Sequence, residues 1–250
     1  CGAEVTFKAD ETTAKCVYCA TEVVATGESH KAMSPQYLVP FALSKDDAQK
    51  AFRAWLKKLW FAPSKLKTMA RRSERLTGVY FPFWTFDAKT ESAYDGERGV
   101  DYQVQEKTTN ADGEQTTRTV TKTRWNHVSG HVARDFDDVL VTASNSLPEN
   151  LTTRLDEWDL SQLHAYDEQF LAGFRAQTYT KGIKDGFRDA KGEMERVIER
   201  DVRRDIGGDH QRVHHVDTRF SGVTFKYLLL PVWSFAYKFK GKAYQVLVNA

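Results

Sequence analysis

The segment that decides the fold is Leu76–Ala88, LTGVYFPFWTFDA, in which most residues are apolar. A strand with apolar side chains at consecutive positions is buried on both of its faces. The pattern returns in Leu229–Tyr237, LLPVWSFAY, and both copies share the order apolar, Pro, apolar, Trp, Ser or Thr, Phe. We therefore predict two equivalent core strands of one β-rich body, with Trp84 and Trp233 buried. A paired aromatic binding surface is the alternative.

Outward from these strands, the chain shows a hairpin pattern and a helical pattern. The Thr-rich segments Val100–Thr108 and Glu114–Trp125 flank the turn sequence Asn110-Ala111-Asp112-Gly113, which predicts a long exposed β-hairpin. Residues Tyr179–Ile206 carry one apolar stripe on an otherwise charged helix, which Gly207 and Gly208 end. We expect this helix to pack on the sheet, and a coiled-coil partner helix is the alternative.

The charges of the chain are segregated. The net charge is only +2, but ten basic residues stand against three acidic ones between residues 45 and 75. Apolar positions at helical spacing after Ser44 predict a helix that ends before Pro63, and a second short basic helix follows over 64–70. Local positive charge favours an anionic partner. The predicted contact residues are Lys57, Lys58, Lys65, Lys67, Arg71 and Arg72.

Three cysteines lie close together near the start of the numbering. Cys16 and Cys19 form a C-x-x-C motif, and Cys1-Gly2 has the form of a first C-x-x-C-G motif whose leading cysteine lies upstream. This layout is typical of a zinc ribbon, where four thiolates hold a structural Zn²⁺ and leave no position for a reactive water. We predict a Zn²⁺ held by Cys1, Cys16, Cys19 and one further cysteine. A redox C-x-x-C, free thiols and a lipidated Cys1 are the alternatives.

These features together predict an α+β fold class. Residues 1–28 would form an N-terminal zinc ribbon with a truncated first knuckle, and residues 29–75 a linker with basic helices. Residues 76–250 would form a mainly antiparallel, β-rich α+β domain. That domain contains the Pro-x-Trp repeat and the long amphipathic helix over 179–206.

The composition bounds the class of protein. Hydrophobic residues make up 41% and aromatic residues 12% of the 250 positions, which is enough for a sizeable core. The mean hydropathy is −0.56, and no apolar run approaches the roughly 18 residues that a membrane helix needs. We therefore predict a globular, cytoplasmic protein without a transmembrane segment.

The sequence carries no convincing catalytic motif. The densest polar cluster is Asp135, Asp137 and Asp138 with His131, and His215 and Asp217 would share one strand face further on. Either group could hold a divalent ion, whereas turn caps and surface charges are the simpler interpretation. We expect no enzymatic activity, and an enzyme with an unrecognised Asp/His site is the alternative.

Several segments occur in an order that resembles a known family. Besides the cysteine motifs, they are LTGVYFPFWTFDA, YDGERG, SGHVARDFDDVLV, ASNSLP, EWDL, YDEQFLAGF, IGGDHQRV and TFKYLLLPVWSFAY. They are similar to bacterial zinc-ribbon-containing proteins of the transcription-factor-IIB type, some of which are labelled primosomal protein N-prime, a helicase. Family sequences start with a complete first C-x-x-C and usually extend past the last strand, so the resemblance implies that this chain is a fragment.

The resemblance covers nearly the whole chain and implies a zinc ribbon, but the family has no established activity. The chain lacks the G-x-x-x-x-G-K-[ST] loop of a helicase. We predict a non-catalytic zinc-ribbon binding protein that contacts nucleic acid or a protein through the zinc ribbon and the basic helices. The alternative is a membrane-surface or homo-oligomeric scaffold, in which the basic helix lies on anionic lipid or the Thr-rich hairpin pairs with another subunit.

Overall fold

The computed structural model describes residues 13–15, 22–24, 33–58, 76–109, 115–146, 158–239 and 242–250. The chain divides into two compact units. Unit 1 comprises residues 1–85, 140–188 and 225–250, and unit 2 comprises residues 86–139 and 189–224. Three long strands and one helix contribute residues to both units, and each unit is described by itself below.

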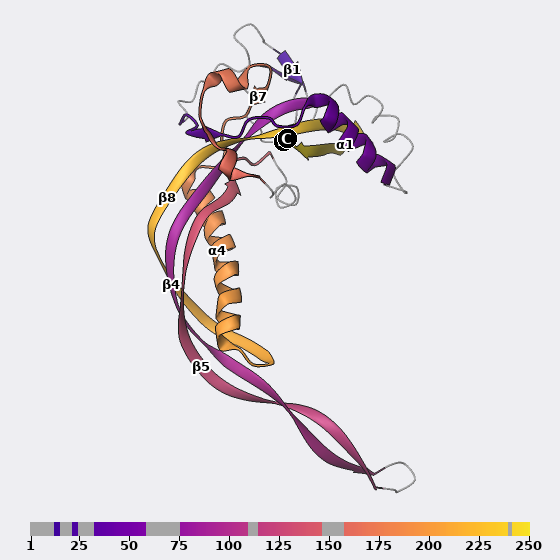
Figure 1. Ribbon diagram of the computed structural model, residues 1–250, viewed down its shortest axis with the longest axis vertical. Coiled ribbons are helices and arrows are strands. Elements are labelled where there is room, and N and C mark those ends of the chain that lie inside the picture. Colours follow the sequence, from indigo (N-terminus) through magenta and orange to yellow (C-terminus); the bar gives the residue numbers. More distant parts are fainter. Residues whose placement is uncertain are drawn as a thin grey trace. The chain divides into compact units, whose positions relative to one another are not determined.

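The elements are dominated by strands (Figure 1). In chain order they are β1 (Thr13–Lys15), β2 (Glu22–Val24), β3 (Tyr37–Leu38), α1 (Lys45–Lys58), β4 (Thr77–Thr109), β5 (Gln115–Thr142), η2 (Leu160–Gln162), β6 (His164–Ala165), η3 (Glu168–Leu171), β7 (Arg175–Ala176), α4 (Ile183–Ile206), β8 (His210–Phe239) and β9 (Lys242–Asn249). The main sheet has the order β5-β4-β8-β3-β6, with β7 paired to β4 and β9 paired to β8.

The predicted fold class is wrong. The described residues are mostly β, in one large mixed sheet with the two α-helices α1 and α4, rather than an α+β domain with mainly antiparallel strands. The sheet is mixed because β3 pairs in parallel with β8, and β7 pairs in parallel with β4. No zinc ribbon is seen in the described part of the N-terminal region, where β1 and β2 form a three-pair antiparallel hairpin. Of the predicted basic helices only the first, α1, lies within the described residues, and the segment predicted for the second lies outside them.

The core of unit 1 lies around the two Pro-x-Trp segments, as the sequence predicts. The strands β4 and β8 that carry them are neighbours in the sheet, and Trp84 and Trp233 are both buried. Each indole is also hydrogen-bonded, because Trp84 Nε1 donates to the carbonyl of Lys181 at 2.9 Å and Trp233 Nε1 to that of Leu43 at 2.9 Å. A buried indole with its N–H paired is a core residue, not a binding surface.

Both faces of β4 are covered in unit 1. One face places Val79, Phe81 and Phe83 against Leu228, Leu230 and Val232 of β8. The residues between them point the other way, where Trp84 packs against Tyr179 and Tyr227. The prediction from the consecutive apolar residues, a strand buried on both faces, is therefore confirmed.

Helix α1 is held by its apolar side. Ser44 Oγ accepts a hydrogen bond from the backbone N–H of Asp47 at 3.2 Å, so it caps the helix as its sequence predicts. Ala48 and Phe52 are buried in one cluster with Trp233 and Phe235. The apolar side of α1 is thus part of the core of unit 1, so far as its side chains are described.

Unit 2 is a sheet with a helix on one face. Its sheet is formed by residues 86–109 of β4, 115–139 of β5 and 210–224 of β8, and residues 189–206 of α4 pack against it. Residues Gly207 and Gly208 end the helix with positive φ values of 65° and 78°, a conformation that glycine adopts without strain. No helix among the described residues combines the length and apolar character needed to cross a membrane.

Candidate functional site

The predicted zinc ligands lie outside the described residues. Cys1, Cys16 and Cys19 all fall in undescribed positions. The hairpin of β1 and β2 flanks two of them, because its register pairs Lys15 with Glu22. The zinc site stays a prediction.

Most of the predicted basic contact residues also lie outside the description. They are Lys65, Lys67, Arg71 and Arg72. Lys57 belongs to α1 but its side chain is not described, and Lys58 is exposed at the end of that helix. Because Ala48 and Phe52 are buried, α1 offers solvent its basic side and keeps the described part of its apolar side in the core.

The described polar chemistry gathers in unit 2, where α4 packs on the sheet. Ile198, Val202 and Ile206 are buried and form a cluster with Tyr94 of β4. Residues at spacings of three and four lie on one side of a helix, so the apolar stripe that the sequence shows is the packing face. The charged residues of α4 are therefore left at its flanks, next to β5 on one side and β8 on the other.

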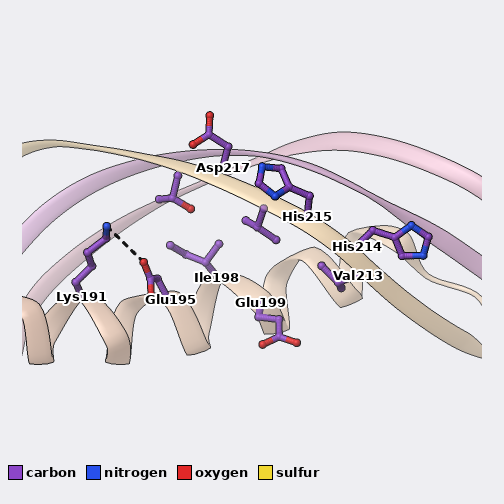
Figure 2. Close-up of a pocket in the computed structure, with 10 residues that line it drawn as sticks. Lys191, Glu195, Ile198, Glu199, Val213, His214, His215 and Asp217 are labelled. Carbon is purple, nitrogen blue, oxygen red and sulfur yellow. Dashed lines mark ion pairs between the residues drawn. The ribbon is translucent and has the colours of Figure 1, made fainter.

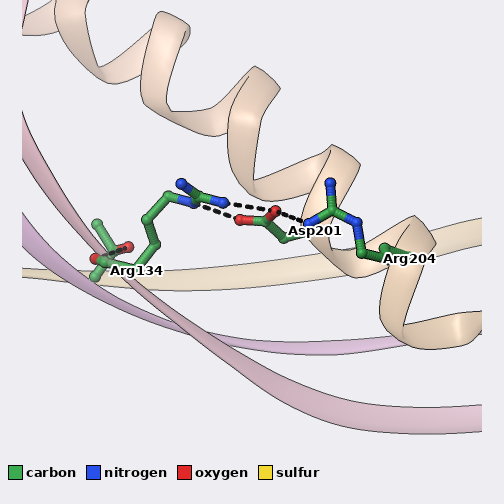
Figure 3. Close-up of polar contacts among 4 residues, drawn as sticks. Arg134, Asp201 and Arg204 are labelled. Atoms are coloured by element: carbon green, nitrogen blue, oxygen red, sulfur yellow. Dashed lines mark hydrogen bonds and ion pairs between the residues drawn. The ribbon is translucent and has the colours of Figure 1, made fainter.

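An ion pair fixes the helix against β5 (Figure 3). Arg134 Nε and Nη2 donate to the two oxygens of Asp201 at 2.5 and 2.9 Å, and Arg204 Nη1 lies 3.3 Å from the same carboxylate. The hydrogen bond from Arg134 lowers the pKa of Asp201, whose side chain is only 14% exposed. A two-point contact of this kind sets the position of α4 along the strand as well as its distance from it.

Tyr94 makes the second polar contact under the helix. Its hydroxyl donates to the carboxylate of Asp205, and burial, the larger cause, together with that acceptor raises the pKa of Tyr94 to about 12. Gly130 of β5 lies below the ring, because a Cβ added there would come within 2.5 to 2.9 Å of three Tyr94 atoms. A side chain at position 130 would collide with the tyrosine, so the glycine permits this close contact.

On the β8 side, helix and strand border an open groove of about 530 Å³. Figure 2 shows the lining side chains. Those from α4 are Lys191, Glu195, Ile198 and Glu199, and those from β8 are the consecutive residues Val213, His214, His215, Val216, Asp217 and Thr218. The predicted pair His215 and Asp217 is therefore found on this one groove, whereas Glu195 and Glu199 were not predicted.

The acids of the groove differ in their partners. Lys191 Nζ lies 3.6 Å from Glu195, and Arg203 Nη2 lies 2.6 Å from Glu199. All these side chains are near half exposed, so solvent screens the pairs. Asp217 has no ion-pair partner among the described residues. Two of the three acids in the groove are thus ion-paired, and Asp217 leaves one negative charge in excess.

The opposite face of the sheet carries a second polar group. His214 lies 3.8 Å from Asp95 and 3.7 Å from Glu97, and Arg212 bonds Glu97 at 3.1 Å. The Arg212 guanidinium also lies 3.8 Å from the centre of the Trp125 ring. Arg212 and Glu97 form an ion pair and His214 lies beside both acids, which suits a closed surface network better than a ligand site.

A third polar group replaces the predicted Asp135, Asp137, Asp138 and His131 cluster. The carboxylates of Asp137 and Asp138 instead lie with Asp87, within 4.8 Å of one another. Strand alternation failed as a guide because Asp138 has a φ of 51°, which breaks the alternation. Asp87 already accepts from the Asp138 backbone N–H and from Thr224 Oγ1, both at 2.8 Å, so it serves to hold the backbone.

The hairpin arms beyond Gly99 form an exposed two-stranded segment, called the ribbon here: residues 101–109 of β4 and 115–123 of β5. None of its described side chains is buried, and Tyr102 is 47% exposed. Its charges pair across the strands, as between Lys122 and Glu106 at 2.5 Å. The described part of the chain therefore buries neither face of the ribbon.

Comparisons with known proteins identify one relative and no function. No family model matches the chain, and no solved structure matches it. The uncharacterized protein YdjG of Bacillus subtilis (strain 168) is 27% identical over 212 residues, which is 83% of this chain. The chain spans 58% of the length of that relative.

Proposed function

We propose that this chain is a non-catalytic binding protein whose ribbon docks a protein partner. The observation that carries the proposal is the exposure of the ribbon: two paired strands with no buried side chain among those described. An isolated two-stranded hairpin is marginally stable in water, because it has no apolar face to cover. A long ribbon that the rest of its chain leaves uncovered is best explained by a partner that covers it.

The charge of the ribbon favours protein over a polyanion. Between residues 100 and 125 the sequence has four basic and four acidic residues. Nucleic acid binding requires a surplus of Lys and Arg to neutralise phosphates, and a balanced surface lacks it. Tyr102, Val104 and Val120 supply apolar contact area instead, and all three are at least partly exposed.

Nucleic acid is the second candidate partner, at a different place. This second proposal rests on α1, which buries its described apolar residues and leaves Lys45, Arg53 and Lys58 exposed. The rest of the basic segment, up to residue 75, follows directly after this helix in the sequence. The same packing weakens the membrane-surface alternative, because the helix cannot also lay Ala48 and Phe52 on lipid. We retain a cytoplasmic location as part of the proposal.

We further propose a structural Zn²⁺ on the cysteines. The donor set supports it, since thiolates at C-x-x-C spacing suit Zn²⁺, and so does the β1–β2 hairpin that pairs the residues on either side of Cys16 and Cys19. We expect metal analysis of the purified protein to find zinc, and a Cys16→Ser, Cys19→Ser variant to lose it. Purified protein free of zinc after refolding with excess metal would contradict this proposal.

The docking proposal is tested by site-specific photo-crosslinking. A photoreactive benzoylphenylalanine replaces Tyr102 in the ribbon or, as the control, Val223, which is 42% exposed on β8. We expect a defined protein adduct from position 102 only, and at least tenfold weaker binding of that purified partner by Tyr102→Glu. Sedimentation identifies a second copy of the chain if it is the partner. Equal adducts at both positions, or none at 102, would overturn the proposal.

A further inference from the structure

We propose that the groove between α4 and β8 binds an extended basic segment of a partner protein, which adds as a strand to the free edge of β8. This inference takes the proposed protein-binding function as its starting point and adds a second site to it. The site lies within unit 2 and is made of Lys191–Glu199 on the helix and Val213–Thr218 on the strand.

The edge of β8 faces the groove. Successive side chains of a strand point to opposite faces, so one cavity on a sheet face is normally lined by alternate residues. Here six consecutive residues, Val213–Thr218, line the same cavity. The backbone edge of the strand therefore forms part of the wall.

This edge carries no strand among the described residues. β4 is the neighbour of β8 on the other side. On the free side, β3 pairs with β8 only at Leu228 and Leu229, and β9 pairs only from Val232 onward. An unpaired edge offers a row of N–H and C=O groups to an incoming extended peptide, and such peptides gain their affinity from main-chain hydrogen bonds.

Charge complementarity selects a basic occupant. The lining contains three carboxylates, Glu195, Glu199 and Asp217, of which Lys191 pairs with Glu195 and the neighbouring Arg203 with Glu199, so one negative charge is in excess. The two glutamates come from the helix, and Asp217 projects from β8 on the side that faces away from α4 (Figure 2). Lys or Arg at alternate positions of the added strand would all point to the same face of the sheet. In the register that turns them toward α4, they would lie beside Glu195 and Glu199.

The floor of the groove suits the stems of those side chains. Ile198 is 1% exposed, and Val213 and Val216 are partly buried beside it. Long basic side chains lay their methylene groups on apolar surface and keep the charge at its rim. A metal ion suits the groove less well, because the described ligand atoms that gather closely enough for one are those of Asp87, Asp137 and Asp138.

The test measures binding of a defined probe to the full chain. The probe is a fluorescent seven-residue peptide of alternating Lys and Val, and its charge control replaces each Lys with Glu. A third peptide keeps all side chains but carries N-methyl groups on alternate backbone nitrogens, which removes donors for strand addition. We expect the Lys peptide to bind at low salt, and the Glu and N-methylated peptides to bind at least tenfold more weakly.

Two protein variants with equal charge change locate the site. The groove variant is Glu195→Gln, Glu199→Gln, Asp217→Asn, and the matched control is Glu91→Gln, Asp135→Asn, Glu193→Gln, all at exposed or partly exposed positions of unit 2. We expect the groove variant to weaken binding at least tenfold and the control less than twofold. Unchanged circular dichroism and melting confirm that both variants fold, since surface pairs contribute little to stability.

The outcomes separate the two proposals. Equal losses in both variants, or equal binding of the N-methylated peptide, would show diffuse attraction and overturn strand addition in the groove. Failure of the Lys peptide to bind overturns the groove proposal, while a position-specific adduct at residue 102 still supports the ribbon. Protection of the β8 amides over 214–217 from hydrogen exchange by the Lys peptide would support the groove independently.

Discussion

Unit 1 and unit 2 share β4, β5 and β8 but bury them in different ways. In unit 1, Trp84 and Tyr227 are buried on one side of the sheet while Phe81 and Leu228 fill the other. In unit 2, α4 covers one face and the other carries paired charges around Trp125. The difference teaches that one strand can serve as core along part of its length and as interaction surface along the rest. Both the ribbon and the groove that we propose as protein-binding sites lie in unit 2.

The largest expected effect compares two tryptophans. Trp233 in unit 1 is 7% exposed and touches the rings of Phe41 and Phe174, whereas Trp125 in unit 2 is partly exposed beneath Arg212. We expect Trp233→Ala to lower the free energy of unfolding by about 3–5 kcal/mol, and Trp125→Ala by about 1 kcal/mol. Urea titrations measure both. Similar losses would break the distinction between the units.

The next effect tests the close contact in unit 2 between Gly130 and the ring of Tyr94. Gly130→Ala forces a methyl group into the ring of Tyr94, and we expect a loss of about 1–3 kcal/mol from overpacking. Gly192 of α4 is the control, because a Cβ there meets nothing within 4 Å. Gly192→Ala should stabilise the protein by about 0.5–1 kcal/mol. Thermal melts of both variants provide the comparison, and a harmless Gly130→Ala would show a looser interface.

The smallest effect concerns the ion pair between Arg134 and Asp201. The pKa of the Asp201 carboxyl is lowered in the folded state. The ion pair therefore stabilises the fold above the pKa of about 3.9 that an unfolded Asp has, and this stabilisation is lost as the pH falls through the pKa of Asp201 in the folded protein. Partial exposure of Arg134 limits the effect, and we expect Asp201→Asn to lose about 1–2 kcal/mol at pH 7. Stability curves of the two proteins should converge below about pH 4. A constant difference would argue against a role for the charge.

The elements that sequence predicts well are those with a long, regular pattern. The Pro-x-Trp strands, the hairpin and the apolar stripe of α4 all repeat over many residues, and each is found, although α4 starts at Ile183 rather than 179. The mixed character of the sheet could not be predicted, because β3 and β7 have two residues each and therefore no periodicity. The predicted division at residues 28 and 75 stays a prediction.

The candidate site was only partly accessible from the sequence. The spacing of His215 and Asp217 placed them on one side of a strand, and both line the groove. The sequence pattern of the helix places Glu195 and Glu199 among the ordinary charged residues of its solvent-exposed face. Their importance depends on the free edge of β8 beside them, which is a tertiary property. The positive φ of Asp138 likewise breaks the strand alternation. The carboxylates of Asp137 and Asp138 therefore lie together, which regular alternation does not predict.

The pairing of β8 with segments from the start of the chain has a consequence for how the protein is made. The backbone N–H of Tyr227 bonds the side chain of Gln36, 191 residues earlier, and Ser92 bonds Thr218 across 126 residues. Topologies built from such distant contacts fold slowly. At ribosomal speeds of about 5–20 residues per second, β8 emerges roughly 7–27 s after β4. During that interval the edge of β4 that β8 will cover is unpaired, and an exposed apolar strand edge favours aggregation of the nascent chain.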